Sequence, residues 1–276
     1  MMEQRSVLIT GCSSGIGRHA AHGLKARGYR VFATARKQAD VNNLVSEGLE
    51  SVQLDIANSA SIHDAFECIM QKTDGKLYAL FNNAAFGISG AVEDLSRAAL
   101  RDIFEVNLFG THELTRRVIP VMRQQGHGRI IQNSSVLGFV ALKYRGAYNA
   151  SKFALEGLSD TLRMELEDTD IFVSLIEPGP IESNFRKNAY AAYKRYIDKN
   201  GSVFRQIYEQ TEVRLQTEGP AVPFTSGPEA VFKMVIHALE SKRPRTRYRV
   251  TFPTWLFAYM KRLLPDRAMD KILMRI

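Results

Sequence analysis

The chain has 276 residues, of which 45% are hydrophobic and 24% are charged, and its formal net charge is +8. These proportions exclude a mainly disordered chain, and the length suits one large α/β domain over residues 1–276. The excess positive charge would suit nucleic acid, anionic lipid or an anionic cofactor, and composition alone does not choose among them.

The N-terminus and the cysteines indicate the cellular setting. The residues before the first apolar run include Glu3 and Arg5 and lack the continuous apolar stretch of a secretion signal. Cys12 and Cys68 fall on different predicted elements, so no disulfide is indicated. We therefore expect a reducing, cytoplasmic setting. The six histidines do not have metal-ligand spacing, and we expect no metal site.

Short apolar runs alternate with stretches of helical period. The predicted strands cover residues 6–10, 30–34, 51–54, 77–82, 129–133, 171–176 and 247–251, and a further helix is predicted over 227–239. This alternation is typical of βαβ units with right-handed crossovers. We therefore predict an α/β fold, a single-domain Rossmann-type doubly wound parallel sheet with helices on both faces.

The first predicted strand ends in a glycine-rich turn that leads into a helix. Strand, tight turn and helix in this order place backbone N–H groups and a helix N-terminus around a dinucleotide pyrophosphate. Glycine is needed where a Cβ would block the phosphate. The predicted cofactor-binding residues of this turn are Gly11, Ser13, Ser14, Gly15, Ile16 and Gly17.

The end of the second predicted strand indicates which dinucleotide is bound. NAD-binding proteins carry an acidic residue here for the adenosine ribose. In this chain Ala35 and Arg36 occupy the region, and an arginine can bind a phosphate through two hydrogen bonds. The pair therefore predicts NADP(H) rather than NAD. The alternative is that Arg36 is a solvated surface charge.

Tyr148 and Lys152 are four residues apart in a predicted helix and therefore lie on one face of it. A free tyrosine has a pKa of about 10, and a neighbouring ammonium favours the phenolate. We expect Lys152 and an oxidised nicotinamide ring to lower the pKa of Tyr148 together. Tyr148 would then exchange a proton near neutral pH. The alternative is an ordinary core tyrosine.

In combination, these motifs resemble those of the short-chain dehydrogenase/reductase family, from Val7 to about Val250. The resemblance implies a catalytic tetrad, matched in order and spacing, of Asn107, Ser135, Tyr148 and Lys152. It also implies cofactor contacts by Asp55, Asn82, Ala84, Tyr148, Lys152, Pro178, Gly179, Ile181 and Ser183. From local sequence alone, Asp55 reads equally well as a helix N-cap. Ala85 and Ser183 stand where the family usually has glycine and threonine, which affects only fine cofactor positioning.

Within the family, the chain looks most like bacterial NADP-dependent aldehyde reductases related to retinol and 17β-hydroxysteroid dehydrogenases. The resemblance implies that Tyr148 protonates a carbonyl oxygen to which Ser135 is hydrogen-bonded. Lys152 would hold the nicotinamide ribose, Asn107 would position a water, and the protein would be a homo-oligomer. Aromatic residues in the segments expected to edge the pocket favour an apolar aldehyde or ketone. They are Phe86, Phe139, Phe185, Tyr190, Tyr193 and Tyr196.

Three later segments carry further expectations. Residues 181–223 are rich in Tyr, Lys and Arg and are predicted to form a substrate lid after the sixth strand. The basic run 242–249 is expected to be a solvated face, and it lacks an element that would read nucleic acid. Residues 252–276 are aromatic and basic; we favour packing against the sheet or a neighbouring subunit over weak membrane-surface contact.

Two other functions fit parts of the pattern. One is a non-catalytic NADP-binding sensor or scaffold that keeps the fold for regulation, against which the intact tetrad argues. The other is a peripheral membrane protein that acts through its C-terminal segment. The preferred prediction is an NADP-dependent enzyme that interconverts an apolar carbonyl compound and its alcohol, with reduction favoured.

Overall fold

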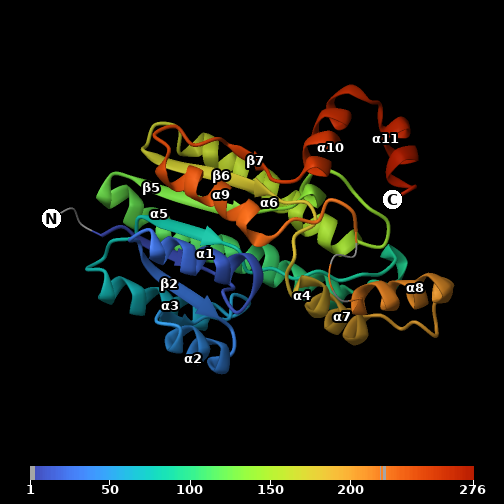
Figure 1. Ribbon diagram of the computed structural model, residues 1–276, viewed down its shortest axis with the longest axis horizontal. Coiled ribbons are helices and arrows are strands. Elements are labelled where there is room, and N and C mark those ends of the chain that lie inside the picture. Colours follow the sequence, from blue (N-terminus) through green and yellow to red (C-terminus); the bar gives the residue numbers. More distant parts are fainter. Residues whose placement is uncertain (1–3, 218, 220–221) are drawn as a thin grey trace.

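The computed structural model describes residues 4–217, 219 and 222–276, so part of the predicted lid, residues 218, 220 and 221, lies outside the described residues. Seven parallel strands form one sheet in the order β3-β2-β1-β4-β5-β6-β7 (Figure 1). They are β1 (Ser6–Ile9), β2 (Arg30–Ala35), β3 (Glu50–Gln53), β4 (Ala79–Asn82), β5 (Gly128–Asn133), β6 (Ile171–Glu177) and β7 (Arg247–Arg249). The predicted α/β doubly wound fold is confirmed. Every strand end lies within two residues of its predicted position.

Helices cover both faces of the sheet. One face carries α1 (Gly15–Ala26), α2 (Gln38–Ser46) and α9 (Pro228–Glu240), and the other carries α3 (Ser59–Lys72), α5 (Thr111–Gln125) and α6 (Gly146–Glu165). Successive strand residues point to opposite faces, so Val7 and Ile9 join the first core while Leu8 joins the second. Burial on both faces explains why the strands read as continuous apolar runs.

The strand order reverses between β1 and β4, where the chain crosses from one half of the sheet to the other. Ligands of open α/β sheets bind at the carboxyl ends of the strands beside such a switch point. Here β1 leads into the glycine turn, and β4 leads into Asn83 and Ala84. The topology therefore brings the predicted cofactor segments to one edge.

A long helical stretch passes beside this edge. α4 (Arg97–Phe104) continues through the π-helical segment η2 (Glu105–Gly110) into α5. Gly110 lies so close to the backbone of Ile56 that any side chain there would clash with the Ile56 carbonyl oxygen. π-Helical turns within α-helices are frequent at functional sites. The segment contains Asn107, one of the predicted tetrad residues.

The described part of the predicted lid contains two helices, α7 (Phe185–Tyr196) and α8 (Arg205–Gln216). Figure 1 shows them with α4 at one end of the molecule. Their buried side chains form a third apolar cluster with residues of α4 and α6. The Tyr208 hydroxyl donates to Asp94 and accepts from the backbone N–H of Ala91 at 2.9 Å. The lid is thus tied to the short 3₁₀ helix η1 (Val92–Asp94).

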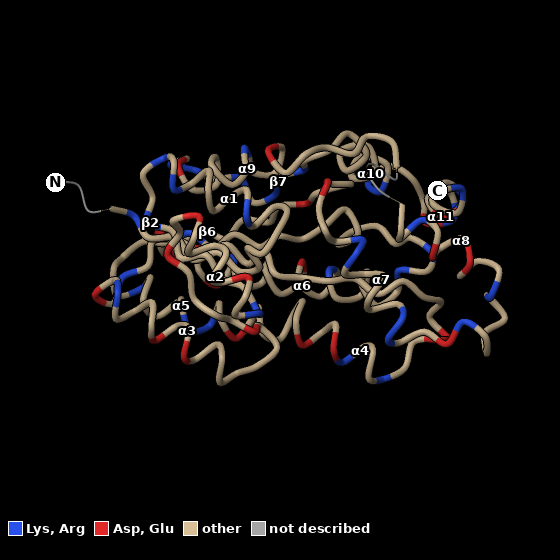
Figure 2. The backbone as a smooth tube through the Cα atoms, turned by 60° about the horizontal axis from the view of Figure 1, so that its bottom comes forward, with Lys and Arg blue, Asp and Glu red and all other residues tan. Residues whose placement is uncertain are grey.

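The C-terminal segment forms α10 (Phe252–Leu263) and α11 (Asp266–Leu273), which stand out from the sheet in Figure 1. Only Thr254, Ala258 and Met269 of these two helices are buried. The segment therefore packs only lightly on the rest of the chain, and packing against a neighbouring subunit stays a prediction. Within the described residues, none of the helices is both long enough and apolar enough to cross a bilayer. Figure 2 shows Lys and Arg interspersed with Asp and Glu over most elements.

Candidate active site

One cavity of about 970 Å³ adjoins both the glycine turn and the end of β5. The predicted site residues that line it are Gly11, Ser13, Ser14, Gly15, Ile16, Arg36, Asp55, Ala84, Ser135, Tyr148, Lys152, Pro178, Gly179, Ile181 and Ser183. Gly17, Asn82 and Asn107 do not line it. The fold therefore gathers most of the predicted cofactor and catalytic residues, which are far apart in the sequence, around one space.

The glycine turn has the shape that a pyrophosphate requires. Gly11 has a φ of +72°, and a Cβ there would lie 2.8 Å from the Cα of Ala84. Ser14, the N-cap of α1, makes no side-chain capping bond, and the first turn of α1 contains no acidic residue. The first backbone N–H groups of α1 therefore face the cavity with no side chain of their own helix bonded to them. This arrangement fits an anionic dinucleotide.

Gly17 and Asn82 support the turn from behind. A Cβ on Gly17 would lie 2.6 Å from Nδ2 of Asn83, so glycine is needed for close packing rather than for contact with the cavity. Asn82 is buried and donates to the Thr115 hydroxyl at 2.8 Å. Its neighbour Asn83 points the other way and lines the cavity. We selected Asn82 and Ala84 from the motif, whereas the alternation of a strand end exposes Asn83.

A chain of amide contacts joins the glycine turn to Lys152. Asn83 donates to the carbonyl oxygens of Thr10 and Gly11 at 2.9 and 3.1 Å. Asn133 donates to Asn83 at 2.9 Å, and Lys152 donates from Nζ to the carbonyl oxygen of Asn133 at 2.7 Å. Asn133, which sequence reasoning missed, is the last residue of β5 and immediately precedes Ser134 and Ser135. The two halves of the site are therefore one connected structure.

Tyr148 is buried beside Ser135, and its ring packs edge-on against Phe185 with the ring centroids 5.3 Å apart. Burial raises the pKa of Tyr148 to about 12, and the hydrogen bond with Ser135 opposes this shift. The predicted lowering of this pKa needs Lys152 and an oxidised nicotinamide ring together, so for the dinucleotide-bound site it stays a prediction. Lys152 Nζ lies 5.8 Å from the centre of the tyrosine ring and is directed toward the Asn133 carbonyl. In the chain without a bound dinucleotide, desolvation is the largest effect on this pKa and favours the neutral phenol.

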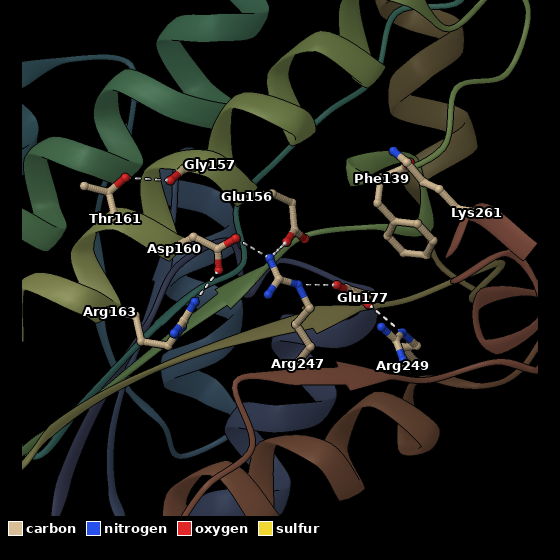
Figure 3. A network of polar contacts seen from close by, with 10 residues as sticks. All are labelled: Phe139, Glu156, Gly157, Asp160, Thr161, Arg163, Glu177, Arg247, Arg249 and Lys261. Carbon is tan, nitrogen blue, oxygen red and sulfur yellow. Dashed lines mark hydrogen bonds and ion pairs between the residues drawn. The ribbon is translucent and has the colours of Figure 1, made fainter. Parts of the chain in front are cut away.

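Lys152 is almost fully buried, and burial lowers its pKa to about 8. The carboxylate of Glu156, one turn further along α6, opposes the shift. Figure 3 shows Glu156 in a network around Arg247, which contacts Glu156 at 3.1 Å, Asp160 at 2.6 Å and Glu177 at 3.0 Å. A lysine that titrates near physiological pH lies directly beside this network.

Asn107 is held firmly but contacts neither Tyr148 nor Lys152 through its side chain. Its side chain accepts from the backbone N–H of Phe86 at 3.0 Å and donates to the Phe86 carbonyl at 2.9 Å. It also donates to Ser151 at 3.0 Å, and Ser151 donates to the Tyr148 carbonyl at 2.9 Å. Asn107 thus fixes the segment after Ala85 relative to the helix that carries Tyr148. Ala85 itself does not have a positive φ, so alanine is tolerated there.

The turn after β6 closes the cavity on another side. The backbone N–H of Val136 donates to the Pro178 carbonyl at 2.8 Å. Any Cβ on Gly179 would clash with the hydroxyl of Thr251, which sequence reasoning did not identify. Ile181 pairs with Ser226 across a short bridge. A Cβ on Gly15 would lie 2.7 Å from the Cβ of Ser183, which accounts for a small residue at position 183.

Arg36 and Asp55 lie at the end of the cavity beside β2 and β3. Arg36 is exposed, and no acidic partner is recorded for its guanidinium within the described chain. Asp55 accepts from the backbone N–H of Ala57 at 3.1 Å. Asn58, not Asp55, caps α3 by accepting from the N–H of Ser61 at 3.1 Å. The N-cap alternative for Asp55 is therefore wrong.

The aromatic residues expected around the pocket are only partly brought together. Phe86, Phe185 and Tyr196 line the cavity, whereas Phe139, Tyr190 and Tyr193 do not. Tyr193 is instead buried in the core of the lid. Cys12 is buried in the glycine turn, where burial raises the pKa of its thiol to about 12, so it is a poor nucleophile. In the described ranges, His, Cys, Asp and Glu form no group of three or more that could hold a metal.

Comparison with known proteins places this site in a family. The family described as short chain dehydrogenase matches residues 5–194. "Uncharacterized oxidoreductase YbbO" of Escherichia coli is 45% identical over 270 residues, 98% of this chain and 94% of that protein. "Retinol dehydrogenase 8" of Homo sapiens is 33% identical over 88% of this chain and 80% of that protein. An actinorhodin polyketide ketoreductase solved with NADPH has a TM-score of 0.74 at 26% identity, over 90% of this chain and 95% of that one.

The predicted family is confirmed by the match over most of the chain and by relatives with more than 30% identity. The fold, the glycine turn at its switch point and the Tyr148–Lys152 pair agree with that assignment. The chain belongs to the short-chain dehydrogenase/reductase family of oxidoreductases, which act on small molecules with a nicotinamide dinucleotide.

Proposed function

We propose that the protein is an NADP-dependent reductase that converts an apolar aldehyde or ketone into its alcohol. The observation that carries this proposal is that Ser135, Tyr148 and Lys152 line the same cavity as the glycine turn. Gly11 to Ile16, Asp55, Ala84 and the turn at Pro178 and Gly179 would hold the dinucleotide, and Arg36 would bind its 2′-phosphate. The bound dinucleotide supplies the hydride for the carbonyl carbon.

The protonation state of Tyr148 favours reduction over oxidation. Because burial keeps the phenol neutral, Tyr148 carries the proton that the carbonyl oxygen must receive as the alcohol forms. Ser135 lies within hydrogen-bonding reach of Tyr148 and can donate to the same oxygen while negative charge develops on it. Oxidation would require the phenolate as a base, which is less accessible at neutral pH.

Apolar side chains in the lining of the cavity support an apolar substrate. They are Ile88, Leu137, Leu142, Phe185, Ala189 and Leu215. Pockets of this composition bury hydrophobic ligands and use few polar groups to orient them. The similarity to a retinol dehydrogenase agrees with such a substrate.

NADPH consumption with a panel of aliphatic and aromatic aldehydes and ketones tests the proposal. We expect turnover to increase with the apolar length of the carbonyl compound and NADPH to be used better than NADH. A protein that binds NADPH but reduces no member of the panel would instead support the sensor or scaffold function.

The pKa of Lys152 predicts how reduction depends on pH. The pKa is lowered to about 8, so the ammonium is present below that pH and is lost above it. We expect kcat/KM to be constant near pH 7 and to fall up to about tenfold per pH unit above pH 8. Above that pH, Lys152 is neutral and no longer supplies a positive charge beside Tyr148. Glu156→Gln removes the charge that raises the lysine pKa, so the alkaline limb should move to lower pH. An unchanged limb in this variant would contradict the assignment.

Arg36→Asp tests the choice of dinucleotide. The substitution replaces a phosphate ligand with a repelling carboxylate, so the preference for NADPH over NADH should fall by about 10- to 100-fold. Arg36→Lys keeps the charge but loses the planar fork, and an intermediate preference is expected. Dissociation constants of both dinucleotides measure the effect, and an equal loss for the two would show that Arg36 does not bind the phosphate.

We further propose a cytoplasmic homo-oligomer. Phe109 on η2 and Leu158 on α6 are large apolar residues that are exposed in the single chain, near the tetrad helices. Contact between copies of these helices would cover them. Weak membrane-surface contact through α10 is the lesser proposal, supported by the exposed rings of Trp255 and Tyr259.

A further inference from the structure

An arginine that has no carboxylate partner among the described residues lines the cavity that also holds the proposed proton donor. Arg145 is three residues before Tyr148 and is partly buried. Its guanidinium donates to the carbonyl oxygen of Tyr144 at 2.9 Å, and it forms no ion pair with the carboxylates of the described residues. Arg214 of α8, more exposed, lines the same cavity.

The surroundings of Arg145 disfavour a positive charge in three ways. Burial and, as the smaller effect, the like charge of Arg214 together lower its pKa to about 10, so it is still cationic at neutral pH. Arg145 is also the N-cap of α6, a helix of 20 residues whose dipole is positive at that end. Burying an unpaired charge is costly, so an arginine in such a position needs an explanation.

Other arginines of the same protein show what a purely structural position looks like. Arg247, also partly buried, contacts three carboxylates. Arg195, at the rim of the cavity, pairs with Asp102 at 3.5 Å. Asp102 also accepts a hydrogen bond from the hydroxyl of Tyr196, so its carboxylate already has two partners. Among the described residues, neither Arg145 nor Arg214 has a carboxylate partner of this kind.

The bond to Tyr144 does not by itself explain Arg145. The Tyr144 carbonyl also accepts from the backbone N–H of Gly90 at 3.0 Å, so it is satisfied without the guanidinium. The remaining N–H donors of Arg145 are unused by the described residues. A guanidinium with free donors on the wall of a ligand cavity is suited to a carboxylate or phosphate oxygen.

We propose that Arg145 and Arg214 bind an anionic group, a carboxylate or a phosphate, carried by an otherwise apolar carbonyl substrate. This inference rests on the proposed function and narrows its substrate class to oxo acids or oxo phosphates. The apolar walls hold the hydrocarbon part, Ser135 and Tyr148 face the carbonyl oxygen, and the arginine pair fixes the other end. Such an arrangement orients the substrate with two polar contacts, as is usual for ligand pockets.

Reduction of matched substrates tests the proposal. ω-Oxo acids of 6 to 12 carbons, their methyl esters and the corresponding ω-oxo alkyl phosphates are compared in the presence of NADPH. Charge-assisted hydrogen bonds predict that kcat/KM for one anionic series exceeds that for the ester by about tenfold or more, mainly through KM. In Arg145→Gln and Arg214→Gln the ratio of anion to ester should fall toward 1. Arg205→Gln, on α8 but away from the cavity, is the matched control and should keep the ratio.

Stability gives a readout that does not depend on turnover. Arg145→Gln should raise the melting temperature because it removes a partly buried charge that has no carboxylate partner among the described residues, whereas Arg205→Gln breaks a surface pair with Glu209 and should not raise it. Decanoate should raise the melting temperature of wild type and have less effect on Arg145→Gln.

The outcomes separate the two proposals. Wild type that reduces esters and anions equally well, with the same ratio in Arg145→Gln, would overturn the anion site and leave the reductase intact. Wild type that reduces neither series, yet is stabilised by decanoate through Arg145, would overturn the reductase and support the anion site.

Discussion

Tyr148→Phe is expected to lower kcat for carbonyl reduction by about 10³-fold while NADPH binding is retained. General acids typically contribute 10² to 10⁴ in rate, and in this site the phenol is hydrogen-bonded with Ser135. Removing one oxygen from a buried ring changes the packing against Phe185 little. Single-turnover NADPH oxidation measures the chemical step, and quenching of protein fluorescence by NADPH measures binding.

Tyr193→Phe is the matched control for this prediction. Tyr193 belongs to the same apolar cluster as Tyr148, but its buried hydroxyl has no hydrogen-bond partner among the described residues, and Tyr193 does not line the cavity. Its removal should leave kcat within about twofold and should stabilise the fold slightly, because an unsatisfied polar group is removed. Equal rates in wild type and Tyr148→Phe would reject the proposed mechanism.

The acidity of Tyr148 shows where reasoning from the sequence reached its limit. The four-residue spacing correctly places Tyr148 and Lys152 on one helix face. Burial of both groups is a tertiary property, and in the chain without a dinucleotide it raises the pKa of the tyrosine and lowers that of the lysine. The lysine charge is also directed elsewhere, because the carbonyl of Asn133 accepts from it. Spacing predicts proximity, but only the surrounding atoms decide which protonation state is stable.

The fold was more predictable than the site because its signals are local. Strands buried on both faces must be apolar along their whole length, so residues such as Leu8 and Val7 identify them without tertiary information. The lid helices α7 and α8 are mostly polar and form through contacts with η1 and α6, which local periodicity cannot show. Similarly, Asn83 and Asn133 line the cavity because of the way β4 and β5 end. The sequence does not distinguish these two residues from the polar residues next to them.

The basic run 242–249 gives the clearest contrast between composition and structure. We expected a solvated face, yet Arg247 and Arg249 reach into the network of Figure 3. Both form ion pairs with Glu177, whose side chain is 1% exposed. A dense positive run can therefore neutralise acids that the sequence places far away, in this case on β6 and α6. The expectation of a solvated face is wrong for these two arginines.

Arg247→Met should destabilise the fold by about 3–5 kcal/mol, the usual cost of removing one partner from a buried ion pair. It would leave Glu156, Asp160 and Glu177 together with less neutralising charge. Arg245→Met is the matched control: Arg245 is an exposed arginine two residues away, and its loss should change stability by less than about 0.5 kcal/mol. Urea unfolding of wild type and both variants measures the difference.

The loss of folding stability caused by Arg247→Met should become larger as the pH rises. In the folded wild type, burial and the charge of Glu156 raise the pKa of Glu177 from 4.5 to about 7, so the folded state binds this proton more tightly than the unfolded state. Its contribution to stability is therefore full below pH 4.5 and is lost as the pH rises to about 7. Without Arg247 the pKa of Glu177 rises further, and the loss extends above pH 7. Unfolding at pH 5 and pH 8 should show a markedly larger deficit at pH 8, whereas equal deficits would mean that Arg247 acts through packing rather than through charge.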